Sequence, residues 1–251
     1  MKTDSIINRI YLSGIDSEAF AIAKASGFGF EETAFCWAPM MEDADALRDG
    51  EERAQAGLSG WFHAPFAELI PCSIDPLAVE NTRKRYRQAI DLALKLGYRR
   101  MVFHGGFIPQ VYFPQWYVER TVLFWENFLN EVPEDVMIAL ENVMEPSPET
   151  LVSIVSEVND KRLGLCLDVG HANTNVSKTA PIDWVEPFAP YLKHVHLHNN
   201  DGDWDLHRSL GDGTIDMEAV LKKLIVTDCT FTLEDRNCAG SIAWLKEKGF
   251  I

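Results

Sequence analysis

Side chains that bind metal ions recur along this chain, most of them directly after a short apolar run. Gly-Trp-Phe precedes His63, Met-Ile-Ala-Leu precedes Glu141 and Leu-Cys-Leu precedes Asp168. Imidazole nitrogens and carboxylate oxygens held in one place are the ligands that zinc or manganese requires. The nine candidate ligands are His63, His104, Glu141, Asp168, His171, His196, Asp205, His207 and Glu234. If they converge, the chain is a metal-dependent enzyme.

The carboxylates Glu141, Asp168 and Glu234 are the most specific candidates, because each ends an apolar run. A buried carboxylate needs a cationic partner. That partner is either a metal ion or a basic side chain such as Arg236, two residues after Glu234. Asp168 belongs to the motif Asp-Val-Gly-His171, in which the glycine lets the histidine turn back toward the aspartate. A helix N-cap is the alternative interpretation of this aspartate.

The remaining histidines need more selection. In His194-Val-His196-Leu-His198 the alternation of a strand places all three rings on one face. We select His196, because His194 lies deeper and His198 falls in the following loop. His63 and His104 could each be a core histidine, but they occupy equivalent places on adjacent predicted strands, which favours a shared site.

These positions need a scaffold that brings the ends of separate strands together. Strand-like runs alternate with helix-like segments at about the thirty-residue spacing of one strand–helix unit. The expected strands cover 10–15, 29–35, 60–65, 100–105, 136–143, 163–169, 192–198 and 230–234. Eight units in 251 residues predict a closed (β/α)8 barrel, the TIM barrel of the α/β class, as a single domain over 1–251. The alternative, an open doubly wound sheet, would carry a glycine-rich phosphate loop after its first strand, and this chain has none.

The carboxyl ends of the strands in such a barrel meet at one mouth, where the candidate ligands would lie. The expected helices include 75–96, 116–130, 147–158, 216–224 and 239–248. The first of these carries the basic cluster Arg83, Lys84, Arg85 and Arg87. The cluster fits either a nucleic-acid contact or the solvated face of an outer helix. We favour the solvated face, because the opposite side of the helix is apolar.

Composition bounds the partners and the compartment. The formal net charge is -15 and 47% of the residues are hydrophobic. The chain can therefore bury a large core, whereas its acidity disfavours loose binding to phosphate backbones or anionic lipid. Five cysteines without a Cys-x-x-Cys pair indicate reduced thiols in a cytoplasmic protein. We expect no secretory signal, no membrane span and no nucleic-acid partner, while association into a homo-oligomer stays open.

Two motifs resemble the xylose isomerase-like barrel superfamily, which includes sugar isomerases and epimerases and the endonuclease IV family of abasic-site nucleases. Leu-Cys-Leu-Asp168-Val-Gly-His171-Ala looks like the sixth-strand region of that superfamily. The run 194–213, with Asp205-Leu-His207, looks like its seventh-strand region. Taken alone, the hydrophilic part of this run could also be a surface turn. The resemblance spans the chain from about the second strand onward.

The two branches of the superfamily imply different uses of the same residues. The epimerase branch implies one divalent metal ion held by Glu141, Asp168, His196 and Glu234. Glu141 and Glu234 would then be the acid and base that transfer a proton next to a carbonyl. The nuclease branch implies three zinc ions, held by all nine candidate ligands, in an endonuclease IV-like phosphodiesterase. Every one of these positions carries a matching residue type, which speaks for more than one ion.

Other features favour a small carbohydrate over DNA. The chain has Tyr-Leu-Ser-Gly14 where the nuclease family has His-Val-Ser, and Phe66 where that family has a tyrosine. The segments 37–42 and 105–116 are nearly free of the cationic side chains that grip DNA, and the second is aromatic. We therefore predict a sugar or sugar-phosphate isomerase or epimerase. The predicted substrate contacts are His171, Arg208, Phe66 and Trp116.

Overall fold

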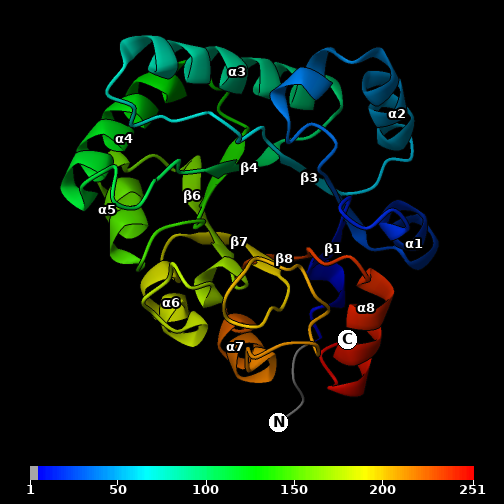
Figure 1. Cartoon of the computed structure of the whole chain (residues 1–251). Coiled ribbons are helices and arrows are strands. Elements are labelled where there is room, and N and C mark those ends of the chain that lie inside the picture. Colours follow the sequence, from blue (N-terminus) through cyan, green and yellow to red (C-terminus); the bar gives the residue numbers. More distant parts are fainter. Residues whose placement is uncertain (1–4) are drawn as a thin grey trace.

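The computed structural model describes residues 5–251, which form a closed barrel of eight parallel strands. The strands are β1 (Ile10–Ser13), β2 (Gly29–Glu32), β3 (Gly60–His63), β4 (Arg100–His104), β5 (Met137–Glu141), β6 (Leu163–Asp168), β7 (Leu192–Leu197) and β8 (Thr230–Leu233). Each strand pairs with the next along the chain, and β8 closes the ring against β1. The strands form the centre of the molecule and the helices surround them (Figure 1). The predicted TIM barrel is confirmed.

A helix follows each strand and packs outside the ring. The helices are α1 (Ala19–Ser26), α2 (Ala44–Ala54), α3 (Pro76–Lys95), α4 (Pro114–Phe128), α5 (Glu149–Val158), α6 (Pro181–Phe188), α7 (Met217–Leu224) and α8 (Cys238–Glu247). The sequence places the start of α3 correctly: the Asp75 carboxylate accepts the Leu77 N–H at 2.9 Å, and Pro76 lies in the first turn. The helix predicted at 116–130 corresponds to α4, which begins earlier, at Pro114. It ends at Phe128, because the next residues, Leu129–Glu131, form a 3-10 helix.

The predicted strands extend one to three residues too far at their carboxyl ends. The strand expected at 29–35 ends at Glu32, for example, because the following residues leave the sheet to form a loop at the mouth. The true ends matter for function, since a candidate ligand is the last residue of four consecutive strands. These residues are His63, His104, Glu141 and Asp168.

The barrel interior has an apolar layer beneath a polar one. Tyr11, Trp61, Val102, Ala139 and Cys166 form a small buried cluster of their own. The larger core lies between the strands and the helices. Side chains two residues apart on a strand face the same side. The next inward position on β3, β4, β5 and β6 is therefore the terminal ligand of each strand, directly above the apolar layer.

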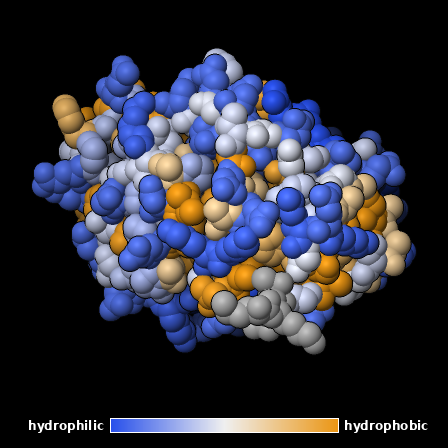
Figure 2. All heavy atoms as spheres, turned by 90° about the horizontal axis from the view of Figure 1, so that it is seen from below, coloured by the Kyte–Doolittle hydropathy of each residue, from blue (hydrophilic) through white to orange (hydrophobic). Residues whose placement is uncertain are grey.

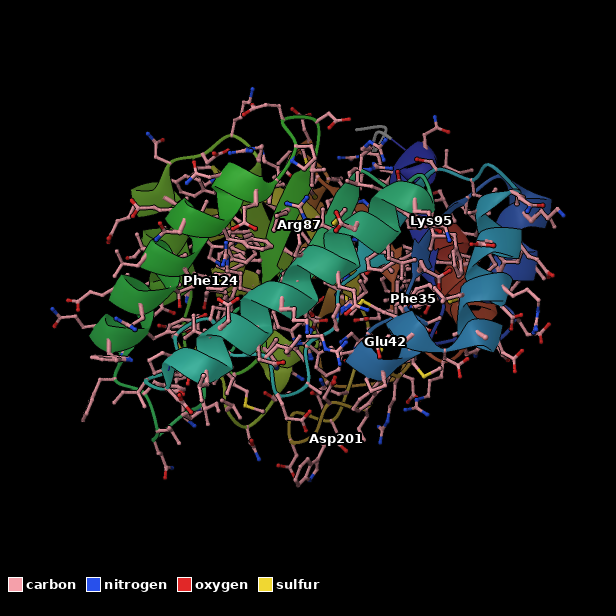
Figure 3. The ribbon with its side chains drawn as sticks, turned by 90° about the horizontal axis from the view of Figure 1, so that it is seen from above. Phe35, Glu42, Arg87, Lys95, Phe124 and Asp201 are labelled. Atoms are coloured by element: carbon pink, nitrogen blue, oxygen red, sulfur yellow. The ribbon has the colours of Figure 1, made fainter. Side chains whose placement is uncertain are left out.

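The outer surface is largely hydrophilic on the side shown in Figure 2. The basic cluster of α3 lies on the opposite side of the molecule, where it is exposed to solvent and Arg83 pairs with Glu131 and Arg87 with Asp91. Figure 3 shows α3 lying across the outside of the barrel with Arg87 and Lys95 on it. Within the described part of the chain, no helix combines the length and the apolar character needed to cross a membrane.

Candidate metal centre

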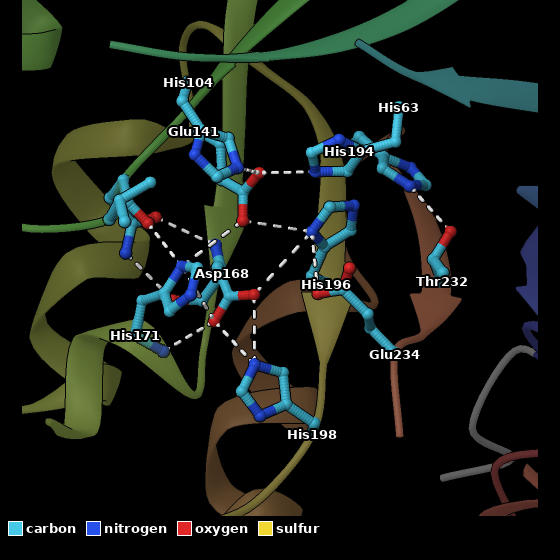
Figure 4. A network of polar contacts seen from close by, with 12 residues as sticks. His63, His104, Glu141, Asp168, His171, His194, His196, His198, Thr232 and Glu234 are labelled. Carbon is cyan, nitrogen blue, oxygen red and sulfur yellow. Dashed lines mark hydrogen bonds and ion pairs between the residues drawn. The ribbon is translucent and has the colours of Figure 1, made fainter. Parts of the chain in front are cut away.

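Six of the seven histidines of the chain lie among carboxylates in the barrel (Figure 4), and the seventh, His207, contacts Asp205. Strand register explains part of this arrangement. His104 is the register partner of Glu141, and Asp168 is the register partner of His196. His207 lies in the loop after β7, and its left-handed backbone (φ 47°) helps turn that loop back toward the mouth. The nine predicted ligands come together in three groups, which we call centres A, B and C.

Centre A consists of Glu141, Asp168, His196 and Glu234, with one ligand atom of each within 4.8 Å of the others. His196 Nδ1 lies 3.2 Å from Glu141, 3.2 Å from Glu234 and 3.6 Å from Asp168. All four side chains are buried. Burial opposes ionisation, yet the neighbouring imidazoles hold the pKa values of Glu141 and Asp168 well below their ordinary range. Three carboxylates around one imidazole nitrogen suit a divalent cation.

Centre B consists of His63, His104 and the second oxygen of Glu141. Glu141 Oε2 lies 3.4 Å from His63 Nε2 and 3.1 Å from His104 Nε2. This buried oxygen nevertheless accepts no hydrogen bond of normal geometry from the described residues. An unpaired carboxylate oxygen in the interior is costly, so a cation between the three side chains is the partner that fits. Glu141 would then be shared between centres A and B.

Centre C forms where the loop after β7 folds over the mouth. Asp205 Oδ2 lies 2.9 Å from His207 Nε2 and 3.3 Å from His171 Nε2. His198 Nε2 is 3.6 Å from the other oxygen of Asp205. Although burial opposes it, the hydrogen bond to Asp205 raises the pKa of His207 to about 9. The hydrophilic segment around Asp205 therefore belongs to the mouth of the barrel.

Three of the candidate ligand rings are anchored by one nitrogen to a backbone carbonyl. The Nδ1 contacts are His63 to Ala64 (2.9 Å), His171 to Asn142 (2.9 Å) and His207 to Glu234 (2.7 Å). A carbonyl oxygen only accepts, so Nδ1 carries the proton and Nε2 of the neutral ring carries none. Each Nε2 faces a carboxylate oxygen, which also only accepts. A second proton or a metal ion must lie between them, and such anchoring is typical of metal-binding histidines.

His196 is anchored by a residue that the sequence analysis passed over. Glu31 on β2 is fully buried, with Oε1 3.0 Å from His196 Nε2 and Oε2 3.1 Å from His194 Nε2. Burial opposes the ionisation of Glu31, but His196 holds its pKa well below the ordinary range. Because the carboxylate only accepts, His196 Nε2 carries the proton and Nδ1 is left to face centre A. In the sequence, the acidic residue Glu31 stands within an apolar strand-like run, and this pattern could have indicated a buried carboxylate.

His194 continues this hydrogen-bonded chain toward the bottom of the barrel. Its Nδ1 lies 2.7 Å from the Thr230 hydroxyl, which accepts the Trp61 indole N–H at 3.0 Å. Burial lowers the pKa of His194 to about 4, so the ring is neutral. A continuous chain of contacts thus runs from Trp61 through Thr230, His194 and Glu31 to His196.

His198 orients Asp168, a role that the sequence analysis did not assign. His198 Nε2 lies 3.0 Å from Asp168 Oδ1. Gly170 makes room for this ring, since a Cβ at that position would lie 1.9 Å from it. The Asn142 side chain also pairs with the backbone N–H and carbonyl of Asp168, at 2.8 and 2.9 Å. Asp168 is thus held from several sides while one face stays open to centre A.

A cavity of 1010 Å³ opens above the three centres. Among the predicted substrate contacts, His171 and Phe66 line it, whereas Trp116 and Arg208 do not. Trp116 lies in the first turn of α4 and donates its indole N–H to the Cys72 carbonyl (3.3 Å). Arg208 lies 3.4 Å from Asp201. Arg236 lines the cavity and, among the described residues, makes no ion pair with Glu234.

Comparison with known proteins agrees with this architecture. A family model described as xylose isomerase-like TIM barrel matches residues 20–248. An uncharacterized protein of Methanocaldococcus jannaschii is 32% identical over 195 residues, which are 72% of this chain and 65% of that protein. The chain thus spans slightly less than two thirds of that relative. A probable endonuclease 4 of Mycobacterium ulcerans is 25% identical over 81% of this chain and 85% of its own length.

Two solved structures are similar over almost the whole chain. A D-tagatose 3-epimerase-like protein superposes with a TM-score of 0.79 at 25% identity, covering 96% of both chains. A Thermus thermophilus protein soaked with ZnCl2 gives a TM-score of 0.79 at 28% identity, covering 96% of this chain and 97% of that one. With the family model matching most of its length, this chain belongs to the xylose isomerase-like TIM barrel family.

Proposed function

We propose that this chain is a divalent-metal-dependent isomerase or epimerase that moves a proton next to the carbonyl of a carbohydrate. The observation that carries the proposal is the placement of Glu141 and Glu234, each 3.2 Å from His196 Nδ1. They come from β5 and from the end of β8, which are not neighbours in the barrel. Proton transfer at one carbon needs two such groups, one to remove a proton and one to return it. The likeness to the D-tagatose 3-epimerase-like protein supports the same class of reaction.

A divalent ion at centre A, such as zinc or manganese, would polarise the carbonyl and hydroxyl oxygens of the substrate. Asp168 and His196 would hold that ion together with the two glutamates. One of the two glutamates, as a carboxylate, removes the proton next to the carbonyl, and the C–H electron pair moves toward the carbonyl oxygen. The electron pair then returns to the carbon as the other glutamate, as a carboxylic acid, delivers a proton to the opposite face. The two carboxyl groups end the turnover with their protonation exchanged.

A phosphoester hydrolase is the second candidate, and it is favoured by the second oxygen of Glu141. That oxygen faces His63 and His104 and would bridge centre A to an ion at centre B. Clustered ions can hold both the attacking and the leaving oxygen of a phosphoester. The likeness to a probable endonuclease 4 supports this interpretation.

Charge weighs against DNA as the substrate of either reaction. The net charge of the chain is -15. Arg236 is the single Arg or Lys among the residues that line the cavity. DNA-binding proteins neutralise several phosphates with such side chains. A small molecule therefore fits the mouth better than a polyanion.

Proton exchange and phosphoester hydrolysis decide between the two candidates. Protein loaded with zinc or manganese is incubated with a panel of ketoses in deuterated water, and deuterium should enter the carbon next to the carbonyl. Glu141→Gln and Glu234→Gln should abolish this exchange. Glu68→Gln is the control, because Glu68 lines the cavity outside the three centres. Hydrolysis of bis(p-nitrophenyl) phosphate or nicking of abasic-site DNA, without sugar exchange by the same preparation, would establish the hydrolase instead.

A further inference from the structure

The cavity above the ion centres has a polar floor and an apolar wall. The histidines and carboxylates of the three centres form the floor. The wall comes from the loops that follow β2, β3, β4 and β5. Its apolar side chains include Met40, Leu69, Ile70, Phe107, Ile108 and Met144. A ligand that reaches the floor must therefore place its remaining atoms against hydrocarbon.

The wall offers few side chains that could bind hydroxyl groups. Outside the three centres, the polar side chains of the lining residues are those of Thr33, Cys36, Trp37, Glu68 and Arg236. A hydroxyl group that leaves water without finding a partner is costly. A free sugar carries a hydroxyl on nearly every carbon, and the carbons beyond the ion centres would find few hydrogen bonds. The wall is thus poorly matched to a polyol chain.

An aromatic path leads from centre B to the cavity opening. The Phe66 ring stacks on His104, with centroids 4.4 Å apart and an angle of 14° between the planes. Trp37 packs against Phe66 at 5.7 Å and is 57% exposed to solvent. Exposed aromatic faces beside a polar site gain contact area when a ligand with its own apolar surface covers them.

We infer that the substrate combines a short hydroxy-carbonyl head with an apolar, aromatic substituent. The head would reach the ion centres, and this part of the inference depends on the proposed function. The substituent would lie along Phe66 and Trp37, and this part depends only on the apolar wall. Free sugars and sugar phosphates are poorer ligands. Their hydroxyls would find few side-chain partners in the wall, and a distal phosphate would find Arg236 as the single Arg or Lys of the lining.

Two open-chain probes with the same head test this inference. The first is 1-hydroxy-4-phenylbutan-2-one, and the second is L-erythrulose, which replaces the phenyl-bearing chain with hydroxyl groups. Isothermal titration calorimetry gives the Kd of each for the zinc-loaded and the metal-free protein. The phenyl probe should bind the zinc-loaded protein about tenfold more tightly or better, because its ring leaves water. Equal or tighter binding of L-erythrulose, or no binding of either probe, overturns the inference.

Variants of the wall should shift this preference. Met40→Gln and Met144→Gln keep the length of the side chain and add hydrogen-bonding groups. Each should reduce the preference for the phenyl probe, which is the Kd of L-erythrulose divided by the Kd of the phenyl probe, by about threefold. Leu123→Gln is the matched control, since Leu123 is a 50% exposed residue of α4 outside the cavity lining. Wall variants that behave like this control contradict the role of the wall.

Deuterium exchange into the same probes separates the failure of this inference from failure of the proposed function. If the phenyl probe binds as expected but neither probe exchanges deuterium, the assignment of the wall stands and the isomerase proposal fails. If L-erythrulose exchanges with a lower KM than the phenyl probe, the isomerase proposal stands and the inference about the substituent fails.

Discussion

Glu31 and His196 share a hydrogen bond of 3.0 Å across the inside of the barrel, from β2 to β7. Since an ionised carboxylate cannot donate, this bond settles which nitrogen of His196 carries the proton. The other nitrogen faces the oxygens of Glu141 and Glu234. A carboxylate behind a metal-binding imidazole fixes its orientation and makes it a better ligand. Glu31 is thus a positioning residue for centre A.

Replacing Glu31 with Gln should weaken zinc binding about 10- to 100-fold. The substitution removes the negative charge and brings an amide NH2 group toward ring nitrogens that now donate. Glu32 provides the control, because it is also buried but pairs with Arg53 at 2.7 Å instead of a histidine. Glu32→Gln should lower the free energy of unfolding and leave zinc affinity unchanged. Competition with a chromophoric chelator measures both affinities, and unchanged binding in Glu31→Gln would refute the positioning role.

The barrel and its mouth could be predicted because the position of a residue along an apolar run determines where it lies in a parallel barrel. His104 and Glu141 each end an apolar run, and the carboxyl ends of parallel strands share one rim. Spacing in the sequence therefore translates directly into position. The start of α3 was equally accessible, since Asp75 and Pro76 are local signals that need no tertiary information.

The network behind the ligands could not be predicted in this way. Glu31 and His194 meet because β2 and β7 face each other at the same depth of the barrel, which a one-dimensional pattern does not contain. The sequence does place His194 deeper than His196 and His198 beyond the strand, as the structure has them. The sequence does not identify the hydrogen-bonding partner of His194 or of His198. Arg208, a predicted substrate contact, is not among the residues that line the cavity, because the path of a long loop decides where its side chains point.

Removing bound metal should lower the melting temperature. Without a cation, the carboxylates of Glu141, Asp168 and Glu234 face one another around a single ring nitrogen. Zinc at about 100 times its Kd would add about 2.7 kcal/mol of stability, or about 5–10 °C for a domain of this size. Differential scanning fluorimetry with EDTA, and again after zinc is restored, checks this. Asp168→Asn should lose most of the zinc-dependent shift, and an unchanged melting temperature in the unmodified protein would contradict the site.

Gly170 should tolerate no side chain, although its backbone does not require glycine. Its φ of -71° suits any residue, but a Cβ would lie 1.9 Å from the His198 ring. Gly170→Ala should displace that ring from Asp168, destabilise the fold by about 1–3 kcal/mol and weaken zinc binding. Gly57→Ala is the control: φ is 67° and the space is open, so a similar loss of stability should come without a change in zinc affinity. Urea unfolding and zinc titration distinguish the two variants, and normal zinc binding by Gly170→Ala would count against the role of His198.

Glu145 should make stability fall as the pH rises. Its carboxyl group is buried and accepts the Tyr117 hydroxyl and the Val143 N–H, each at 2.8 Å. Burial raises the pKa of Glu145 above the value of about 4.3 expected in the unfolded chain. The folded state then keeps its proton longer than the unfolded state, so the contribution of Glu145 to stability declines as the pH passes from the unfolded pKa through the raised one.

Glu145→Gln removes this titration and provides the test. The free energy of unfolding in urea is measured for both proteins from about pH 4 to about pH 8, and the difference should move in favour of the variant as the pH rises. Tyr117→Phe keeps the carboxyl group but removes a hydrogen bond that favours its ionised form. The decline in Tyr117→Phe should therefore extend to higher pH than in the unmodified protein. A difference between Glu145→Gln and the unmodified protein that stays constant across this range would mean that Glu145 ionises as easily in the folded state as in the unfolded one.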